Sequence, residues 1–247
     1  MIEIFGFSLG WRPAVAAGGL VALLAWETAQ PFFALFARSG ERVRHGALNL
    51  ALGALNILVV ALGFAALWLA VTQWAEARGF GLLPWLGLDP LPRAALAVLL
   101  LDAWTYAWHR LNHLVPFLWR FHRLHHTDRA MDATTASRFH TGEIALSSVL
   151  RVPVLALIGC RIEELALYEV LLFTVVQFHH ANIGLPEWLD RPLRTVMVTP
   201  SMHKVHHSII RAECDSNYSS LFSWWDRIFR TRKTVGDPRK IVFGVDE

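Results

Sequence analysis

The chain has 247 residues, of which 54% are hydrophobic and 17% are charged, and this composition is unusual for a soluble domain. Its net charge of +3 fits a membrane surface with anionic lipids better than nucleic acid, since the chain holds no RNA- or DNA-binding motif. The two cysteines, Cys160 and Cys214, are too few for a disulfide framework or a cysteine-based zinc site. We therefore predict an all-α integral membrane helical bundle that forms one domain over 1–247.

Two apolar segments in the N-terminal part predict the first membrane crossings. Residues 46–75 hold no charged residue over 30 positions, whereas about 20 apolar residues are enough to cross a bilayer as a helix. Residues 11–37 are a second candidate. The end of this candidate is marked as cytoplasmic by a cluster of arginines, Arg38, Arg42 and Arg44. We expect N-terminal membrane helices over 1–93, with a loop at the outer surface around 79–92.

Three shorter apolar segments follow. Residues 94–113 predict a return crossing, and its cytoplasmic end is marked by Arg110, Arg120, Arg123 and Arg129. Residues 144–160 and 165–178 are each marginal for a full crossing, and Arg151 and Pro153 weaken the first of them. We expect these two to form a helical hairpin that enters or spans the membrane and returns. In total the sequence predicts about four membrane helices with a histidine-rich helical cap on the cytoplasmic side, as in a multi-pass protein of the bacterial inner membrane.

Eight of the 12 histidines fall into three short motifs, HRLNH, HRLHH and HKVHH. On a helix, positions i, i+3 and i+4 lie on one face, so each motif presents its imidazoles in one direction. Imidazole is the commonest metal ligand among side chains, and eight ligands exceed what one metal needs. The motifs therefore predict a two-metal site at one membrane face, formed by His109, His113, His122, His125, His126, His203, His206 and His207. We expect His45, which lies outside the motifs, to be structural.

The identity of the metal is narrowed by motifs that are absent. Histidines alone suit zinc, copper, nickel and iron. The second position of both HxxHH motifs is basic rather than Glu, so neither is the zinc-protease motif HExxH. The chain also has no ExxH motif, which carries the carboxylate-bridged di-iron site of four-helix bundles. Haem stays an alternative, although neighbouring histidines crowd one side of a metal instead of facing each other across a porphyrin.

The order HxxxH, HxxHH, HxxHH, with the first motif at the end of a membrane helix, resembles the fatty acid hydroxylase and sterol desaturase superfamily of membrane di-iron enzymes. The resemblance covers roughly residues 100–231 and includes DAWTYAWHRLNH, FHHANIGLP, TPSMHKVHH and NYSSLFSWWDRIFRT. It implies that the eight motif histidines bind two irons. It also implies a ninth ligand, His180, which precedes Asn182 by two residues, with His179 beside it a weaker candidate.

The segment SRFHTGE is similar to the family's Arg-x-His-Pro-x-Glu, with Thr141 where proline is usual. His140 is therefore a candidate either for a ligand or for a neighbour of one. Asp102 shares a helical stripe with His109 and His113, and metal-bound histidines commonly donate their second N–H to a carboxylate. We expect Asp102 to anchor a ligand, the alternative being an ion pair with an arginine. Similar supporting roles are expected for Asp128, Asp215 and Asn217.

The resemblance implies an activity as well as a site. Two reduced irons would activate O2 and hydroxylate or desaturate a C–H bond of a fatty acyl chain, a sterol or a related lipid. It makes residues 94–231 the catalytic region and residues 232–247 a C-terminal tail. Electrons are expected from an external ferredoxin- or cytochrome-type protein with its reductase, because no haem, flavin or iron–sulfur segment is visible. Zinc could replace iron in the purified protein.

Two functions from other classes stay in competition at this point. The first is a non-enzymatic membrane protein that binds or transports metal ions. Histidines spread across the whole bilayer would favour it, whereas here they gather at one face. The second is a membrane haem protein in electron transfer.

Overall fold

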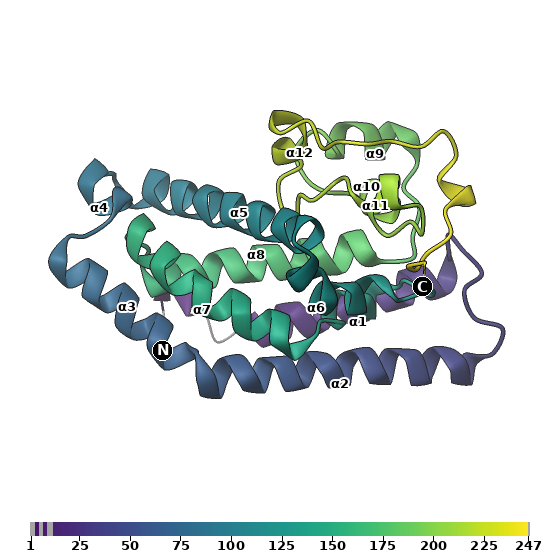
Figure 1. The fold of residues 1–247 in the computed structure, drawn as a ribbon, viewed down its shortest axis with the longest axis horizontal. Coiled ribbons are helices and arrows are strands. Elements are labelled where there is room, and N and C mark those ends of the chain that lie inside the picture. The colour runs from purple at the N-terminus through teal and green to yellow at the C-terminus, as the bar shows by residue number, and fades with distance from the viewer. Residues whose placement is uncertain (1–2, 5–6, 9–11, 247) are drawn as a thin grey trace.

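The structure, a computed structural model, describes residues 3–4, 7–8 and 12–246 (Figure 1). It is helical apart from one antiparallel pair of short strands, β1 (Glu3–Ile4) and β2 (Phe7–Ser8). The helices in chain order are α1 (Arg12–Ala29), α2 (Ser39–Gly63), α3 (Ala65–Arg78), α4 (Leu82–Leu86), α5 (Pro90–Leu114), α6 (Pro116–His126), α7 (Thr141–Ile158), α8 (Ile162–His180), α9 (Glu187–Leu193), α10 (Pro200–His206), α11 (Arg211–Cys214) and α12 (Trp224–Ile228). The 3-10 turns are η2 (Ala133–Ser137) and η3 (Pro238–Lys240).

The N-terminal helices differ from the predicted crossings in their limits. Helix α1 ends at Ala29 and does not reach residue 37, because Pro31 disfavours helical backbone in the residue before it. The segment 46–75, predicted as one crossing, is not a single helix, although the part of it in α2 belongs to a helix that can cross a membrane. Helix α2 begins earlier, at Ser39, and the backbone leaves the helix at Phe64, with φ −130° and ψ −25°, before α3 begins. Helix α3 therefore forms a separate arm that packs against α7 (Figure 1).

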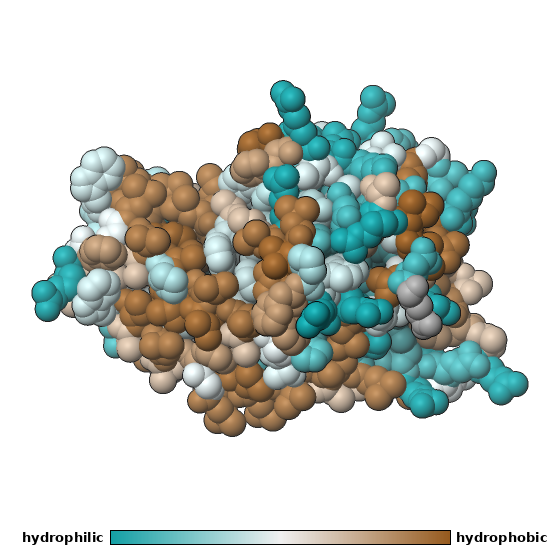
Figure 2. Space-filling view, in the orientation of Figure 1, coloured by the Kyte–Doolittle hydropathy of each residue, from teal (hydrophilic) through white to brown (hydrophobic). Residues whose placement is uncertain are grey.

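Two described helices, α2 and α7, are long and apolar enough to cross a membrane. Only 11% of the apolar window of α2 and 22% of that of α7 are buried, so most of their side chains face outward. Ile57 and Leu62, for example, are 69% and 87% exposed. Figure 2 shows apolar residues over the left and lower part of the molecule. Hydrophilic residues gather over the right end and over the cap, which is formed by α9 to α12 at the upper right. Apolar surface of this extent fits a lipid environment.

The expected hairpin is formed by α7 and α8. Helix α7 continues through Arg151 and Pro153, which we expected to weaken it, and Arg151 pairs with Glu169 of α8 at 2.9 Å. Helices α5 and α8 were both expected to enter the membrane. With 25 and 19 residues they are long enough, but they are less apolar than α2 and α7 and are not candidate spans by composition. Their crossing stays a prediction.

Helix α8 lies at the centre of the bundle, packed against α1, α5 and η2, with α10 on its C-terminal end. The largest apolar core joins α5, α7 and α8 through Leu101, Leu155 and Tyr168. Since α5 runs directly into α6 through a break at Val115, this packing places α6, α10 and the end of α8 together. Three histidine motifs that are distant in sequence are thereby brought to one end of the bundle (Figure 1).

Candidate metal centre

Nine buried histidines form two clusters at this end of the bundle. The first cluster consists of His109, His113, His122, His126 and His206, and the second of His125, His180, His203 and His207. Within each cluster, one ring nitrogen from every histidine lies within 4.8 Å of the others. These nine are the eight motif histidines and the ninth candidate that the sequence indicated. The side chains come from α5, α6, α8 and α10, with His207 directly after α10.

Each HxxHH motif serves both clusters. In α6, His122 and His126 join the first cluster, whereas His125 points to the second. In α10 the assignment is reversed, because His203 and His207 join the second cluster and His206 the first. The clusters adjoin each other, since the rings of His126 and His207 stack with centroids 4.5 Å apart. The motifs thus interlock and form one two-part site.

The outer ring nitrogens of six histidines bind protein oxygens. Backbone carbonyls accept from the Nδ1 atoms of His109 (Tyr218, 2.8 Å), His206 (Ser216, 2.7 Å), His125 (Arg138, 3.2 Å) and His180 (Val176, 2.7 Å). Carboxylates accept from His122 (Glu143, 2.9 Å) and His113 (Asp215, 3.2 Å). An oxygen acceptor places the hydrogen on Nδ1 and leaves a lone pair on Nε2. This arrangement is the usual support of metal-bound histidine.

The Nε2 atoms that face the interior of the clusters are placed as metal ligands would be. The Nε2 atoms of His109, His113 and His206 are buried and have no hydrogen-bond partner among the described residues. In the second cluster, the Nε2 atoms of His125 and His180 face each other at 3.1 Å although both Nδ1 atoms donate to carbonyls. Two lone pairs at this distance repel each other unless a cation lies between them.

A proton is a poor candidate for that cation. Burial lowers the pKa of His206 to about 3 and that of His180 to about 4, so both imidazoles are neutral at ordinary pH. Neutral imidazoles with converging lone pairs are the form that binds transition metals. The residues present therefore fit two metal ions, one in each cluster.

Glu143, at the start of α7, is a supporting residue that sequence reasoning missed. Its Oε1 accepts from His122 Nδ1 and also from Asn112 Nδ2, at 3.1 Å. It lies in the SRFHTGE segment, three residues after His140, so the signal was present in the motif. Asp215 contacts a ligand as expected, and its second oxygen accepts from Arg211 Nε at 2.6 Å.

Asp102 does not contact a histidine, so the expected direct anchor is wrong, and so is the alternative of an arginine partner. Its carboxylate accepts from Leu221 N at 3.2 Å, Phe222 N at 3.0 Å and Trp225 Nε1 at 2.8 Å, and Tyr168 OH lies 3.4 Å away. Asp102 lies two helical turns before His109, about 10 Å along the axis, where the loop before α12 packs. It attaches the cap to α5.

Asp128 and Asn217 also bind neighbours of the ligands and not the ligands themselves. Asp128 accepts from Thr135 Oγ1 at 2.8 Å and lies 2.9 Å from His45 Nε2. His45 is structural, as expected, because it ties α2 to the turn after α6. The Asn217 amide donates to the carbonyls of Met202 and Lys233, beside the Ser216 carbonyl that binds His206. Both residues fix backbone next to a ligand.

Three further side chains complete the surroundings. His140 is exposed, and its Nδ1 accepts from Gly142 N as the N-cap of α7, so it lies outside both clusters. His179 is buried and stacks on His203 with ring centroids 3.9 Å apart, but it belongs to neither cluster. The Cys214 sulfur lies 3.7 Å from His126 Nδ1 and 4.0 Å from His113 Nδ1, and burial raises the pKa of this thiol to about 12.

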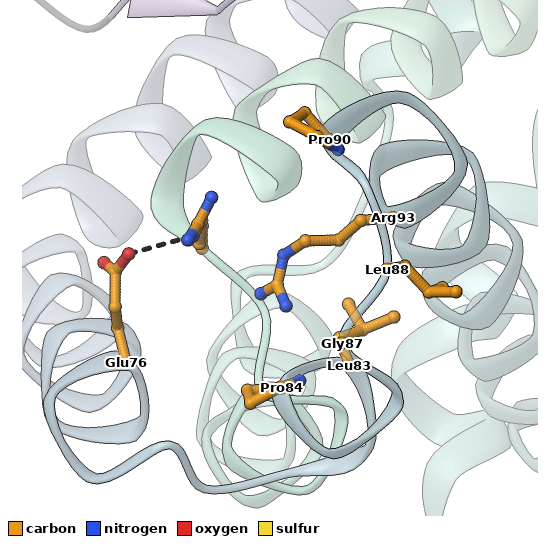
Figure 3. A pocket seen from close by; sticks show the side chains of 8 residues that line it. Glu76, Leu83, Pro84, Gly87, Leu88, Pro90 and Arg93 are labelled. Carbon is orange, nitrogen blue, oxygen red and sulfur yellow. Dashed lines mark ion pairs between the residues drawn. The ribbon is translucent and has the colours of Figure 1, made fainter.

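A cavity of about 350 Å³ opens at the opposite end of α5, between α4 and the turn before α8 (Figure 3). Arg93 reaches into it, about 24 Å along the helix axis from His109. The charges there are balanced, because Arg93 pairs with Glu164 and Arg161 with Glu76. This cavity is remote from the metal centre.

Fold and site together define a membrane-associated helical protein with two buried histidine clusters that fit a metal site. The family model described as fatty acid hydroxylase matches residues 94–231, more than half of the chain. The chain therefore belongs to the fatty acid hydroxylase family, and the resemblance expected from its motifs is confirmed.

Several curated proteins are similar to the chain. Human alkylglycerol monooxygenase is 30% identical over 177 residues, which cover 70% of this chain and 36% of that protein. The ornithine lipid hydroxylase OlsE of Rhizobium tropici is 26% identical over 153 residues (62% and 45%). Rat cholesterol 25-hydroxylase is 25% identical over 166 residues (62% and 51%). The chain thus spans about a third to a half of the length of these relatives. No solved structure matches it.

Proposed function

We propose that the protein is a membrane-bound non-haem di-iron oxidoreductase that uses O2 to hydroxylate, or alternatively desaturate, a lipid. The pair of adjoining clusters, with nine buried histidines and converging lone pairs, carries this proposal. The names of the similar proteins support a lipid substrate, because they refer to an alkylglycerol, an ornithine lipid and cholesterol. A fatty acyl chain, a sterol or a related lipid is the substrate class that follows.

In the proposed site each cluster binds one iron, and zinc could take its place in purified protein. The bound irons would supply the reduction of O2 and the oxidation of the lipid C–H bond. Hydroxylation balances as R–H + O2 + 2e⁻ + 2H⁺ → R–OH + H2O. Desaturation removes two hydrogens from neighbouring carbons and yields two waters from the same inputs. The two electrons come from an external ferredoxin- or cytochrome-type donor with its reductase.

The chain's own residues hold the geometry. Carbonyl and carboxylate acceptors fix the tautomer and orientation of six ligands, so that their Nε2 lone pairs point inward. The histidines lie on or directly after α5, α6, α8 and α10. Helices α5 and α10 pack against α8 and α6 packs against α5, which fixes the two clusters relative to each other. All nine histidines are buried, so bulk water is kept from the reacting centre.

The geometry disfavours the two competing functions. A porphyrin needs an open plane between its axial histidines, whereas the rings of His109 and His206 are only 4.5 Å apart and those of His125 and His207 4.6 Å. A transporter needs ligands along a path. Among residues 12–246, the described groups of potential ligands all lie at the one end of the bundle, and the third group, with Cys214 and Asp215, shares His113 with the first.

We further propose that the metal centre faces the cytoplasm of a bacterial inner membrane. The arginines next to the start of α2 and in α6 lie on the same end of the bundle as the histidines, in agreement with the positive-inside rule. An electron donor would then reach the cap from the cytoplasm.

Metal analysis and isotope labelling of the purified protein test this function. We expect two irons per chain without a Soret band, and with ¹⁸O2 one labelled oxygen in a hydroxylated lipid. A double bond without label in the lipid would select desaturation. A strong Soret band, or turnover that survives substitution of His125 and His206 by Ala, would overturn the proposal. Lipid profiles of a deletion strain would identify the substrate.

A further inference from the structure

A second cavity is lined by residues of α9, α10 and the segment after α12. Figure 1 shows where these elements lie. Its volume is about 820 Å³, within the range of small-ligand sites. One part of its wall is apolar and consists of Phe32, Ile183, Leu185 and Val235. The rest is strongly charged. None of its lining residues belongs to the two histidine clusters, although Lys204 follows His203 directly.

The charged part of the wall has an excess of cations. Five basic side chains line it: Arg191, Arg194, Lys204, Arg227 and Arg232. The two carboxylates of the cavity, Glu187 and Asp190, both pair with Arg194, at 2.5 Å and 3.5 Å. Among the described residues, no carboxylate oxygen lies within 4.0 Å of the other four cations. Four basic side chains therefore face one cavity without a direct ion pair, and the carboxylates of Glu27, Asp190 and Asp226 act on Lys204 or Arg232 only from beyond that distance.

The arginines are held in place close together. Arg227 donates to the carbonyls of Arg194 (Nη2, 2.9 Å) and Thr195 (Nη1, 3.3 Å), so its guanidinium is fixed at the rim. Arg232 has no side-chain acceptor among the described residues. Partial burial, together with the charges of Arg227 and Arg194, lowers the pKa of Arg232. An anion between these side chains would relieve that repulsion.

Lys204 adds a buried cation at the inner wall. Its Nζ donates to the carbonyls of Ala181 at 3.1 Å and Ile183 at 2.9 Å and lies 5.3 Å from the ring centroid of Phe32. An ammonium has three hydrogens, so one donor is left over after these two bonds. Glu27 and Asp190 interact with it electrostatically, but neither carboxylate forms an ion pair with Nζ within 4.0 Å.

We propose that this cavity binds a phosphate group, held by Arg227 and Arg232 at the rim with Lys204 at the inner wall. Arginine forks match the oxygens of phosphate, and several cations around one cavity suit a multiply charged anion. The concave shape and the apolar wall fit a small ligand or a lipid headgroup better than the flat surface of an acidic protein. The phosphate belongs either to a soluble phosphate ester or to the headgroup of a phospholipid.

Calorimetric titration of the full-length, metal-loaded protein in phosphatidylcholine nanodiscs tests the site. The probes are inorganic phosphate, glycerol 1-phosphate and short-chain phosphatidylglycerol, each at low ionic strength. We expect saturable binding of at least one probe. Arg232→Gln and Arg227→Gln should each weaken it by about tenfold or more, since each removes charge-assisted hydrogen bonds. The matched control is Arg78→Gln, an exposed arginine at the far end of α3, which should leave the affinity unchanged.

The choice of probe distinguishes the two sources of phosphate. Binding of the two soluble phosphates supports a soluble ester, and binding of phosphatidylglycerol alone supports a lipid headgroup. No saturable binding of any probe would overturn the proposal. Binding that persists unchanged in both rim variants would also overturn it, because the anion would then lie elsewhere, for example on the metals. Iron content measured on the same samples shows that the metal centre is intact.

Discussion

The two histidine clusters are built from one kind of ligand but are supported in different ways. In the first cluster, the carboxylates of Glu143 and Asp215 accept from two of the five histidines. In the second cluster, His125 and His180 donate to backbone carbonyls, and no carboxylate of the described residues lies within 4.0 Å of its four histidines. The two HxxHH motifs look alike in sequence, yet the two histidine clusters are not equivalent.

The difference has a direct chemical consequence. A carboxylate that accepts from a bound imidazole makes the imidazole more basic and adds negative charge near the metal. The first cluster also offers five ligand atoms against four. The first metal should therefore be held more tightly, and a chelator should remove the second one first.

The largest effect is expected from substituting ligands that are neighbours in one motif but serve different clusters. His206→Ala removes a ligand of the first cluster and His207→Ala one of the second. Each should lower lipid turnover by about 100-fold or more, because both metals are needed, and each should lower the iron content. Iron per chain and lipid product are the measurements. His140→Ala, outside both clusters, is the control, and wild-type iron and turnover in both cluster variants would refute the ligand assignment.

Removing one carboxylate charge tests whether the two clusters bind metal with different affinity. Glu143→Gln keeps an oxygen that can accept from His122 but removes the charge, so the affinity for one of the two metals should fall by about 10- to 100-fold. Competition with a chelator measures it. Glu76→Gln, an exposed ion-pair partner at the opposite end of the bundle, should leave both affinities unchanged. If Glu143→Gln lowered the affinity for both metals equally, the carboxylate would not distinguish the two clusters.

Low pH should reduce the stability of the metal-free protein, because histidines of both clusters become protonated on unfolding. Burial lowers the pKa of His206 to about 3 and of His180 to about 4, from an ordinary value of 6.5. Between the lowered pKa and the ordinary pKa, the unfolded chain therefore binds more protons than the folded chain. The contribution of these histidines to stability is complete above about pH 6.5 and decreases as the pH falls below it. Thermal unfolding of metal-free protein should give a lower Tm at about pH 5 than at about pH 7.5. A Tm that does not change over this range would exclude the neutral, buried state of these histidines.

The smallest effect is expected from Asp102, which supports neither cluster directly. Asp102→Asn replaces an acceptor of two backbone N–H groups and the Trp225 indole, and should cost about 1–3 kcal/mol of stability. At low temperature the iron content should equal that of the wild type. Thermal unfolding gives the first quantity and metal analysis the second. Selective loss of one iron would show that Asp102 acts on a cluster after all.

Local pattern predicted much of the site, because helical spacing is a property of the sequence. The i, i+3, i+4 spacing placed three imidazoles on one side of a short helix, and on that side the rings of His126 in α6 and His206 in α10 lie 4.7 Å apart. The same spacing misled for Asp102, which shares the stripe of His109 but packs against the cap two turns away. Periodicity shows which side chains share a face of a helix, but it does not show which part of the protein packs against that face.

Hydropathy predicted the membrane character but not the limits of the helices. The uncharged stretch 46–75 read as one crossing, whereas the backbone breaks at Phe64, and no charge or proline marks that position. Pro31, in contrast, is a local signal, and α1 ends just before it. Gly63 stands directly before the break, but a single glycine inside a helical pattern is only a weak signal.

The sequence by itself determined that the histidines would present their imidazoles in one direction on the helices of an apolar chain, since helical spacing and hydropathy are both local features. Only the tertiary structure decided which histidines share a cluster and which oxygens hold them. His122 meets Glu143 of α7, and His109 meets the Tyr218 carbonyl, 109 residues further along the chain. Such contacts depend on how α5, α6 and α10 pack around α8, and that packing is a property of the whole chain.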